Sequence, residues 1–311
     1  MSGDTPRCLV LGAGGFIGTN LCLALRARGI PATGFGRTAA PPPILHGLPW
    51  KQGDIGTLPD PDALVAGHTH LFDLIAAGLP GQSEADPAGI VADGMPPRIR
   101  LLAACRRQGV ARIVFASSGG TVYGPSGDLP IREDAPTDPI SAYGIGKLAV
   151  EKYLRLFHHQ HGLDHRILRI GNAYGPFQHP ERGQGLVAAV LNKLRHDAPI
   201  HVWGNGTTVR DYIHIDDVVS AILAAAFSDD PDTRLCNVGS GTGRDVNSVI
   251  RDAARILGRE PRLIHHPGRS GDVPANILDA TRLHVATGWQ PEVGWEDGLA
   301  RTARWLADSR E

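Results

Sequence analysis

The sequence predicts an α/β protein in which a doubly wound parallel sheet is joined to a smaller α/β lobe. Short apolar runs of strand type alternate with helical patterns through the first half of the chain. Such alternation is typical of a parallel sheet with helices on both faces. The chain has 311 residues, 42% of them hydrophobic. This is enough to bury one substantial core and a second, smaller one.

The first predicted element is a strand that begins at Cys8 and breaks at Gly12, where a helical pattern takes over until Gly29. Gly15 and Gly18 follow Gly12 at intervals of three residues. Glycines at this spacing keep the turn tight and let the backbone approach a pyrophosphate, which then sits on the helix N-terminus. Between a first strand and a first helix, the motif predicts a dinucleotide site.

Later elements repeat the alternation. Strands are expected at residues 32–36, 71–76, 112–116 and 166–170, and helices at 98–108 and 142–158. Beyond Asn172 the pattern loosens and glycine-rich turns become frequent. We therefore expect a dinucleotide-binding domain over residues 1–172 and mainly a substrate-binding lobe over 173–311, with about 207–240 returning to the first domain. The cleft between them lies at the carboxyl ends of the strands.

Composition excludes several classes of protein. The net charge is -1 and no basic stripe is present, so no nucleic-acid partner is expected. The absence of a signal-like or membrane-length apolar run predicts a cytoplasmic protein with no membrane partner. The cysteines are widely scattered and are read as reduced thiols: Cys8, Cys22, Cys105 and Cys236. No metal site is predicted, because the histidines clustered at 158–161 suit a helix C-terminus.

Tyr143 and Lys147 are the candidate acid/base pair. Four residues apart on one helix, they share a face about one turn apart. A lysine cation held there under a nicotinamide ring favours the phenolate, so we expect it to lower the tyrosine pKa from about 10. Such a phenol becomes an acid/base near neutral pH. The spacing alone occurs by chance in many helices, and the glycine motif upstream gives it weight.

Several motifs then occur in the order seen in extended short-chain dehydrogenases/reductases: Gly12-x-x-Gly15-x-x-Gly18, Ser117-Ser118, Thr121-Val-Tyr-Gly, Tyr143-x-x-x-Lys147, Asn172-Ala-Tyr-Gly-Pro, Val209-Arg-Asp-Tyr-Ile-His and Arg269-x-Gly-Asp272. Over roughly residues 7–307 the chain resembles the NAD-dependent nucleotide-sugar epimerase/dehydratase group, typified by UDP-glucose 4-epimerase. The resemblance implies a Rossmann-type domain. It assigns these residues to the cofactor, besides Tyr143 and Lys147: Gly12, Gly15, Phe16, Ile17, Gly18, Arg37, Asp54, Ile55, Ala76 and Ala77.

The resemblance also implies a mechanism. Tyr143 removes the proton of a sugar hydroxyl, at C4, while hydride leaves for the nicotinamide, and the 4-keto sugar turns over before the hydride returns. The family places a Ser or Thr where this chain has Gly119, so Ser118 or Thr121 must supply that hydroxyl, or a water does. Related dehydratases and decarboxylases carry a carboxylate at Gly120-Thr121. Its absence disfavours both reactions and leaves epimerisation or keto-reduction.

Cofactor choice is less settled, because an NAD enzyme usually has an acid about 20 residues after the glycine motif. Here the strand ends in Gly36-Arg37. Arg37 can accommodate the 2'-phosphate of NADP or stack on adenine, while Asp54 matches a family position near the adenine. The resemblance favours NAD and leaves NADP possible. The asparagine that the family often places on the helix after the fourth strand is also missing. The corresponding stretch, residues 92–97, ends in Pro96-Pro97, and prolines suit a helix start.

In the substrate lobe the resemblance assigns contacts to a nucleotide sugar, with UDP as the expected nucleotide: Asn172, Trp203, Arg210, Arg269, Asp272 and Asn276. Asn276 is smaller than the tyrosine of some relatives, so N-acetylhexosamines are expected to fit. A homodimer formed through two helices is also implied. An NADPH-dependent reductase of a nucleotide-linked 4-keto sugar and a non-catalytic dinucleotide-binding protein are the alternatives. The sequence leaves the sugar and the nucleobase open.

Overall fold

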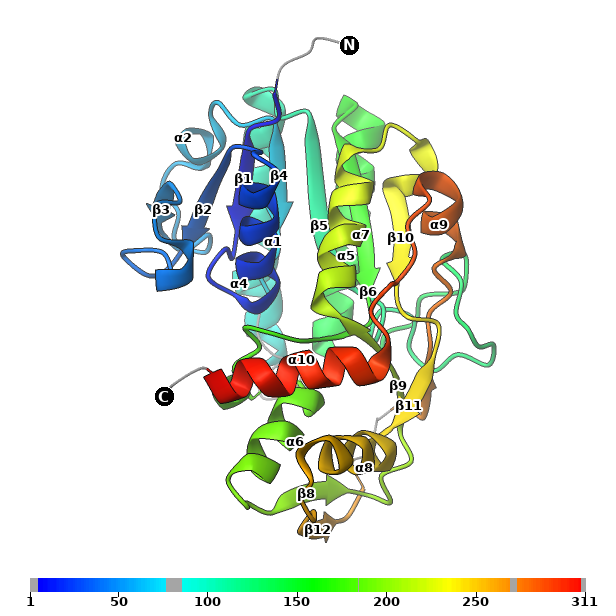
Figure 1. The fold of residues 1–311 in the computed structure, drawn as a ribbon. Helices are drawn as coiled ribbons and strands as arrows, with labels where there is room; N and C mark the ends of the chain where they lie inside the picture. The colour runs from blue at the N-terminus through cyan, green and yellow to red at the C-terminus, as the bar shows by residue number, and fades with distance from the viewer. Residues whose placement is uncertain (1–4, 77–85, 184, 269–272, 309–311) are drawn as a thin grey trace.

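The structure, a computed structural model, describes residues 5–76, 86–183, 185–268 and 273–308. A seven-stranded sheet forms its centre (Figure 1), in the order β10-β6-β5-β4-β1-β2-β3. Every pairing in this sheet is parallel. The strands are β1 (Cys8–Leu11), β2 (Ala32–Gly36), β3 (Trp50–Gln52), β4 (His70–Asp73), β5 (Arg112–Ser118), β6 (Asp164–Ile170) and β10 (Leu235–Val238). The predicted fold class is confirmed.

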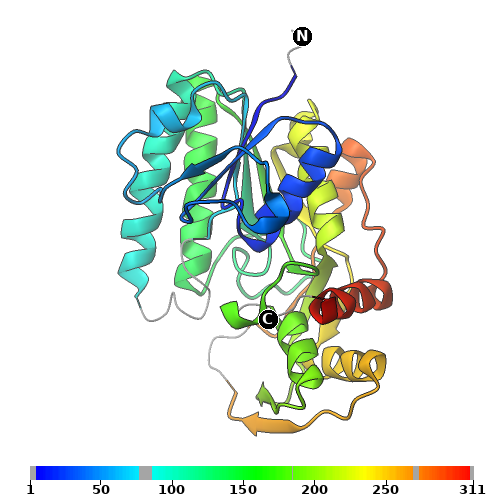
Figure 2. The ribbon, with the colours of Figure 1, turned by 60° about the vertical axis from the view of Figure 1, so that its left-hand side comes forward.

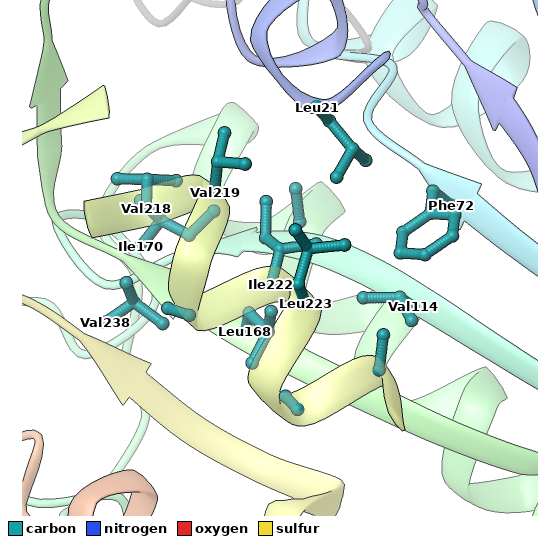
Figure 3. Packing of buried hydrophobic residues seen from close by; sticks show 14 of the residues in the cluster. Leu21, Phe72, Val114, Leu168, Ile170, Val218, Val219, Ile222, Leu223 and Val238 are labelled. Carbon is teal, nitrogen blue, oxygen red and sulfur yellow. The ribbon is translucent and has the colours of Figure 1, made fainter. Parts of the chain in front are cut away.

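Helices cover both faces of this sheet, as Figure 2 shows. On one face lie α1 (Phe16–Ala27) and α7 (Ile215–Phe227), and on the other α4 (Pro87–Arg107) and α5 (Ala142–His161). Alternate residues of each strand point to opposite faces, so Val114 packs with α7 while Phe115 packs on the side of α5. In Figure 3, Ile222 of α7 lies over Leu168 of the sheet. Burial on both faces is the reason that β1 and the middle of β5 are continuous apolar runs.

The strands expected at 112–116 and 166–170 are each two residues longer than expected, and the helix expected at 142–158 is three residues longer. Two other boundaries are wrong for a clear physical reason. The strand expected at 71–76 ends at Asp73, because the next residues leave the ladder and the N–H of Ile75 is bonded to the Asp73 carboxylate (3.2 Å). The helix expected to start at 98 begins at Pro87, with Pro96 and Pro97 inside it. Asp86 caps this earlier start by accepting the N–H of Gly89 (2.9 Å). Burial of later turns of α4 against the sheet outweighs the local cost of the prolines.

A smaller lobe lies beyond one end of the sheet (Figure 1). It contains a mixed sheet of β7 (Asn172–Tyr174), β9 (Val209–His214), β11 (Gly243–Asp245) and β13 (Ala275–Asn276), and a pair formed by β8 (Ile200–Trp203) and β12 (Leu263–His266). Its helices α6 (Leu186–Arg195), α8 (Val246–Leu257) and α10 (Trp295–Asp308) share one apolar core. The shorter elements are α2 (Pro61–Val65), α9 (Thr281–Thr287), η1 (Pro43–Leu45), η2 (Pro180–Arg182) and η3 (Pro231–Arg234). Within the described ranges, no helix is both long and apolar enough to cross a membrane.

Candidate functional site

The turn between β1 and α1 forms a cradle made of backbone. Gly12 has a φ of 76°, which L side chains rarely adopt. A Cβ on Gly18 would collide with the Gly12 carbonyl oxygen, and one on Gly15 would lie 3.1 Å from it. Phe16 and Ile17 begin α1, whose N-cap has no capping side chain and whose first turn has no acid, so its N–H groups remain available to an anion. The turn therefore fits the pyrophosphate of a dinucleotide such as NAD.

The end of β2 lacks the acid that an NAD enzyme usually has there, and the indole of Trp50 occupies the space. The Trp50 ring lies across β2, so that a Cβ on Gly34 would be 2.6 Å from Trp50 Cε3 and one on Gly36 would be 2.8 Å from Trp50 Cζ2. The indole Nε1 donates to the Thr38 carbonyl oxygen (2.8 Å). Arg37 is exposed beside it. A carboxylate at position 36 has no room while Trp50 is in place, and Arg37 is left as the charged group at this strand end.

The other predicted cofactor contacts lie at the same edge of the sheet. Asp54 is exposed and its Oδ1 accepts the N–H of Gly56 (2.8 Å), whereas Ile55 is buried. Ala76 is exposed shortly after β4, and Ala77 lies outside the described residues. Because β2, β3 and β4 are parallel neighbours of β1 or β2, their carboxyl ends meet near the glycine turn. Their contacts with a cofactor stay predictions.

Tyr143 and Lys147 lie on the first turns of α5 and face the carboxyl end of β5. Lys147 is only 7% exposed, and its Nζ donates to the Ala116 carbonyl oxygen (2.7 Å). The ammonium also lies 4.7 Å from the centroid of the Phe115 ring and 5.7 Å from that of Tyr143. The predicted shared helix face is thus present.

In this structure burial outweighs the attraction of Lys147 for the phenolate, and the expected lowering of the Tyr143 pKa under a nicotinamide ring stays a prediction. Burial raises the pKa of Tyr143 to about 12, and the charge that opposes this rise is on Arg98. Burial also lowers the pKa of Lys147 to about 7, with Arg98 adding repulsion and Asp73 and Glu151 acting against it. Sequence reasoning counted the attraction between neighbours four residues apart and left out desolvation, which dominates in so closed a site.

Arg98 of α4 is a feature that sequence reasoning missed. It is 4% exposed and lines a small cavity together with Tyr143 and Lys147. Its Nε donates to the Asp73 carboxylate (2.8 Å), and its two other nitrogens donate to the carbonyl oxygens of Gly94 (3.1 Å) and Ile75 (2.7 Å). Arg98 therefore ties α4 to the strand end beside the glycine turn and brings a permanent cation to the pair. A single arginine in a helical pattern gave no signal of this.

The run after β5 shows why Gly119 is glycine. A Cβ there would collide with Leu278 Cδ1 and lie 3.0 Å from the Arg169 carbonyl oxygen, so Leu278 occupies the place of the missing Ser or Thr side chain. The Thr121 hydroxyl oxygen is buried and has no hydrogen-bond partner among the described residues, which leaves it available to a ligand. Ser118 ends β5 on the same run, where it is half-buried. Of the two predicted hydroxyls, Thr121 is the one that is buried without a hydrogen-bond partner in the described chain.

A buried polar network supports this run from behind, and it too was missed. Ser117 Oγ donates to Glu151 Oε1 (2.5 Å), and Glu151 pairs with Arg169 (2.7 Å). The Arg169 guanidinium lies 4.7 Å from the Tyr123 ring centroid, and the Tyr123 hydroxyl donates to Asn237 (2.7 Å). Every group has a partner, as a network at this depth requires.

Three predicted substrate contacts lie around this run. Asn172 opens β7, and a Cβ on Gly120 would meet its Oδ1 at 3.4 Å. Asn276 is only 1% exposed, and its Nδ2 donates to the Gly119 carbonyl oxygen (3.0 Å). Arg210 stands opposite Asn276 in the register of β9 and β13, and its guanidinium donates to two carbonyl oxygens at 2.7–2.8 Å. In this structure Asn276 is therefore engaged with the chain rather than exposed.

The remaining predicted contacts are more distant in the small lobe. Trp203 is 45% exposed and stacks on His266, with ring centroids 5.2 Å apart and planes 22° apart. The ring of His201 also stacks on His266, with centroids 5.0 Å apart, and its Nδ1 lies 2.7 Å from His266 Nε2. Arg269 and Asp272 lie outside the described residues.

Comparison with known proteins gives consistent matches. Residues 8–239 match the model of the NAD dependent epimerase/dehydratase family. The chain is 32% identical to the UDP-glucose 4-epimerase of Mycolicibacterium smegmatis, over 98% of this chain and 100% of that protein. It is 33% identical to the Azospirillum brasilense UDP-glucose 4-epimerase, over 96% and 91%.

Solved structures agree with these relatives. The crystal structure of the Thermotoga maritima UDP-glucose 4-epimerase with UDP-glucose superimposes with a TM-score of 0.92 at 30% identity, covering 97% of this chain and 99% of that one. A reductase and dehydratases acting on dTDP-linked sugars are similar to this chain at only slightly lower identity, 27–29%.

Proposed function

The chain belongs to the NAD-dependent epimerase/dehydratase family, and we propose that within this family it is a nucleotide-sugar 4-epimerase, acting on a UDP-hexose or UDP-N-acetylhexosamine. The observation that carries the proposal is the run beside Tyr143. It offers the unpartnered Thr121 hydroxyl and no free carboxylate, since Glu151 behind it is held by Arg169. Elimination of water needs an acid at this place, and glycine cannot serve as one.

In this mechanism Tyr143 takes the proton of the sugar 4-hydroxyl and later returns it to the same oxygen, once hydride has been restored to the opposite face of C4. Thr121 donates or accepts the hydrogen bond that orients the reacting oxygen. Lys147, one turn further along α5, is the residue that would hold the nicotinamide ribose. When bound, NAD supplies the acceptor and then the donor of the hydride, so that the reaction needs no other oxidant.

The substrate lobe supports a nucleotide-linked sugar. The exposed Trp203 offers an aromatic surface to a base, and the Arg210 guanidinium is of the type that grips a diphosphate. Arg269 and Asp272 are proposed to complete the contacts with phosphate and ribose, and Asn172 those with the sugar. A smaller side chain than tyrosine at Asn276 is the reason for including N-acetylated sugars.

A homodimer through α4 and α5 is part of the proposal. Three large apolar side chains on these helices are exposed: Val91 (54%), Ile145 (53%) and Leu156 (40%). Pairing of these two helices with those of a second copy would remove such exposed apolar side chains from water.

A second candidate follows from the end of β2. With the acid absent, Trp50 in its place and Arg37 exposed, this end suits a 2'-phosphate as well as a 2'-hydroxyl. That observation favours an NADPH-dependent reductase of a nucleotide-linked 4-keto sugar. Such an enzyme releases its nicotinamide cofactor in each cycle, whereas an epimerase regenerates it in place.

The test is to denature the purified protein and identify the released nucleotide by chromatography with mass detection. We expect NAD, together with interconversion of UDP-glucose and UDP-galactose or of their N-acetylated forms. The Tyr143→Phe variant is the control, and it should keep the nucleotide while losing turnover. An empty site that binds NADPH selectively, with no epimerisation of any of these sugars, would establish the reductase instead.

A further inference from the structure

A second cavity lies at the opposite end of the sheet from the glycine turn. It has a volume of about 280 Å³ and is bounded by the last two turns of α5, the start of β6, η3 and α9. Its charged and polar lining consists of Arg155, His158, His165, Asp232, Arg234 and Arg282. His165 is the second residue of β6, whereas the pair on α5 and the cofactor cradle lie at the carboxyl ends of the strands. The cavity is thus separate from the site described above.

The lining is strongly cationic in a chain whose net charge is only -1. Three guanidinium groups face one carboxylate. Within the described parts of the chain, Arg155 has no ion-pair or hydrogen-bond partner. Arg234 reaches Asp164 only at 3.5 Å, and Arg282 reaches Glu133 at the same distance. A recess lined by excess charge of one sign concentrates ions of the other sign.

Asp164 cannot neutralise this excess positive charge, because it is already paired with other arginines. It pairs with Arg112 and with Arg166, each at 2.8 Å. Arg234, at 3.5 Å, is therefore the third arginine beside this one carboxylate. Arg234 keeps donor capacity for a further anion, since a guanidinium carries five N–H groups.

A buried imidazole with an unmet hydrogen bond belongs to a residue that lines the same cavity. His165 is 3% exposed, and its Nδ1 is buried with no hydrogen-bond partner in the described chain. Its ring stands edge-on to His158, 5.4 Å away. Burial lowers the pKa of His165 to about 4, so the ring is neutral at pH 7 and one of its two nitrogens carries a donor hydrogen.

From these groups we propose that the α5–η3 cavity, the recess lined by these six side chains, binds the phosphate of a small phosphate monoester. Guanidinium forks match phosphate oxygens in pairs, and a neutral imidazole can donate one further hydrogen bond. The volume exceeds what a bare phosphate needs. Asp232 then offers an acceptor to a hydroxyl group of the attached moiety. The cavity would place a phosphorylated metabolite on α5, the helix that also carries Tyr143 and Lys147.

The test measures binding of glucose 6-phosphate and of inorganic phosphate to the full chain by calorimetry, with saturating NAD and UDP present to fill other phosphate-binding sites. We expect one equivalent of the monoester to bind. Arg155→Ala should weaken this binding at least tenfold, and Arg155→Lys should restore part of it. The matched control is Arg132→Ala, an exposed arginine outside the cavity, which should bind as the unaltered protein does.

A second variant guards against misfolding as an explanation. Arg234→Ala should also weaken binding about tenfold while circular dichroism and the melting temperature stay close to those of the unaltered protein. The inference is overturned when both cavity variants bind glucose 6-phosphate as tightly as the control does. It is equally overturned when inorganic phosphate or sulfate binds as well as the monoester, because the cavity is then a site for an adventitious ion only.

Discussion

Replacing Lys147 with methionine is expected to make the nucleotide-free protein more stable at neutral pH while it removes the proposed reaction. The Lys147 ammonium is only 7% exposed and is bonded to one carbonyl oxygen. Burial brings its pKa from an ordinary 10.5 to about 7, which means that the folded protein holds the charged form at a cost. Methionine has a similar length and carries no charge, so it avoids that cost.

The size of the effect follows from the two pKa values. Each pH unit between 10.5 and about 7 corresponds to about 1.4 kcal/mol, which sets an upper limit of about 5 kcal/mol. Between these pH values the unfolded chain binds the lysine proton and the folded chain does not, so the free energy of unfolding rises with pH. Below about pH 7 both states bind the proton and the cost is constant. The advantage of Lys147→Met should therefore shrink by about 1.4 kcal/mol per pH unit as pH rises above 7.

The assay is urea unfolding of both proteins, freed of nucleotide, at pH 7, 8, 9 and 10. Four buried thiols, whose pKa values burial raises to about 12, titrate on unfolding above pH 9 and lower the stability of both proteins alike. The difference between the proteins removes this common loss. Lys152→Met, an exposed lysine on the same helix, is the control and should show a constant difference. A Lys147→Met difference that does not change with pH refutes the reasoning.

Three further substitutions probe neighbouring parts of the site. Gly119→Ser should lower the free energy of unfolding by about 1–3 kcal/mol, measured in urea, and should not raise turnover, because the new side chain meets Leu278; greater activity at unchanged stability would contradict this. Glu151→Leu should cost about 3–5 kcal/mol in the same measurement by leaving its arginine partner buried and unpaired, and a neutral effect would show that the ion pair is dispensable. Gly36→Asp should lower the melting temperature without tightening NAD binding in a fluorescence titration, because the new side chain meets the Trp50 indole. Adding Trp50→Ala should restore the melting temperature and tighten NAD binding. Tighter NAD binding by the single variant would show that the indole does not block the acid.

Features that depend on neighbours along the chain could be predicted from the sequence. The turn around Gly12 requires a residue that tolerates positive φ, and Tyr143 and Lys147 need only a helix to share a face. Contacts between distant segments could not be predicted in this way. Arg98 and Asp73 are 25 residues apart, and Asn276 follows Gly119 by 157. No periodic pattern links such positions, so the Arg98 ion pair was missed and Asn276 was expected to be open to the sugar.

The pair on α5 shows the same limit in its energetics. Spacing predicted that a lysine cation under a nicotinamide ring would lower the Tyr143 pKa, whereas in this structure burial raises that pKa to about 12 and lowers the pKa of Lys147 to about 7. Desolvation depends on how α4 closes over α5, and that packing includes Arg98, which adds a fixed positive charge. In the ligand-free chain the attraction between phenolate and ammonium is therefore small, because neither ion is fully formed. The stability cost of Lys147 and the weak acidity of Tyr143 have the same origin, and a ligand that favours the charged forms must overcome both.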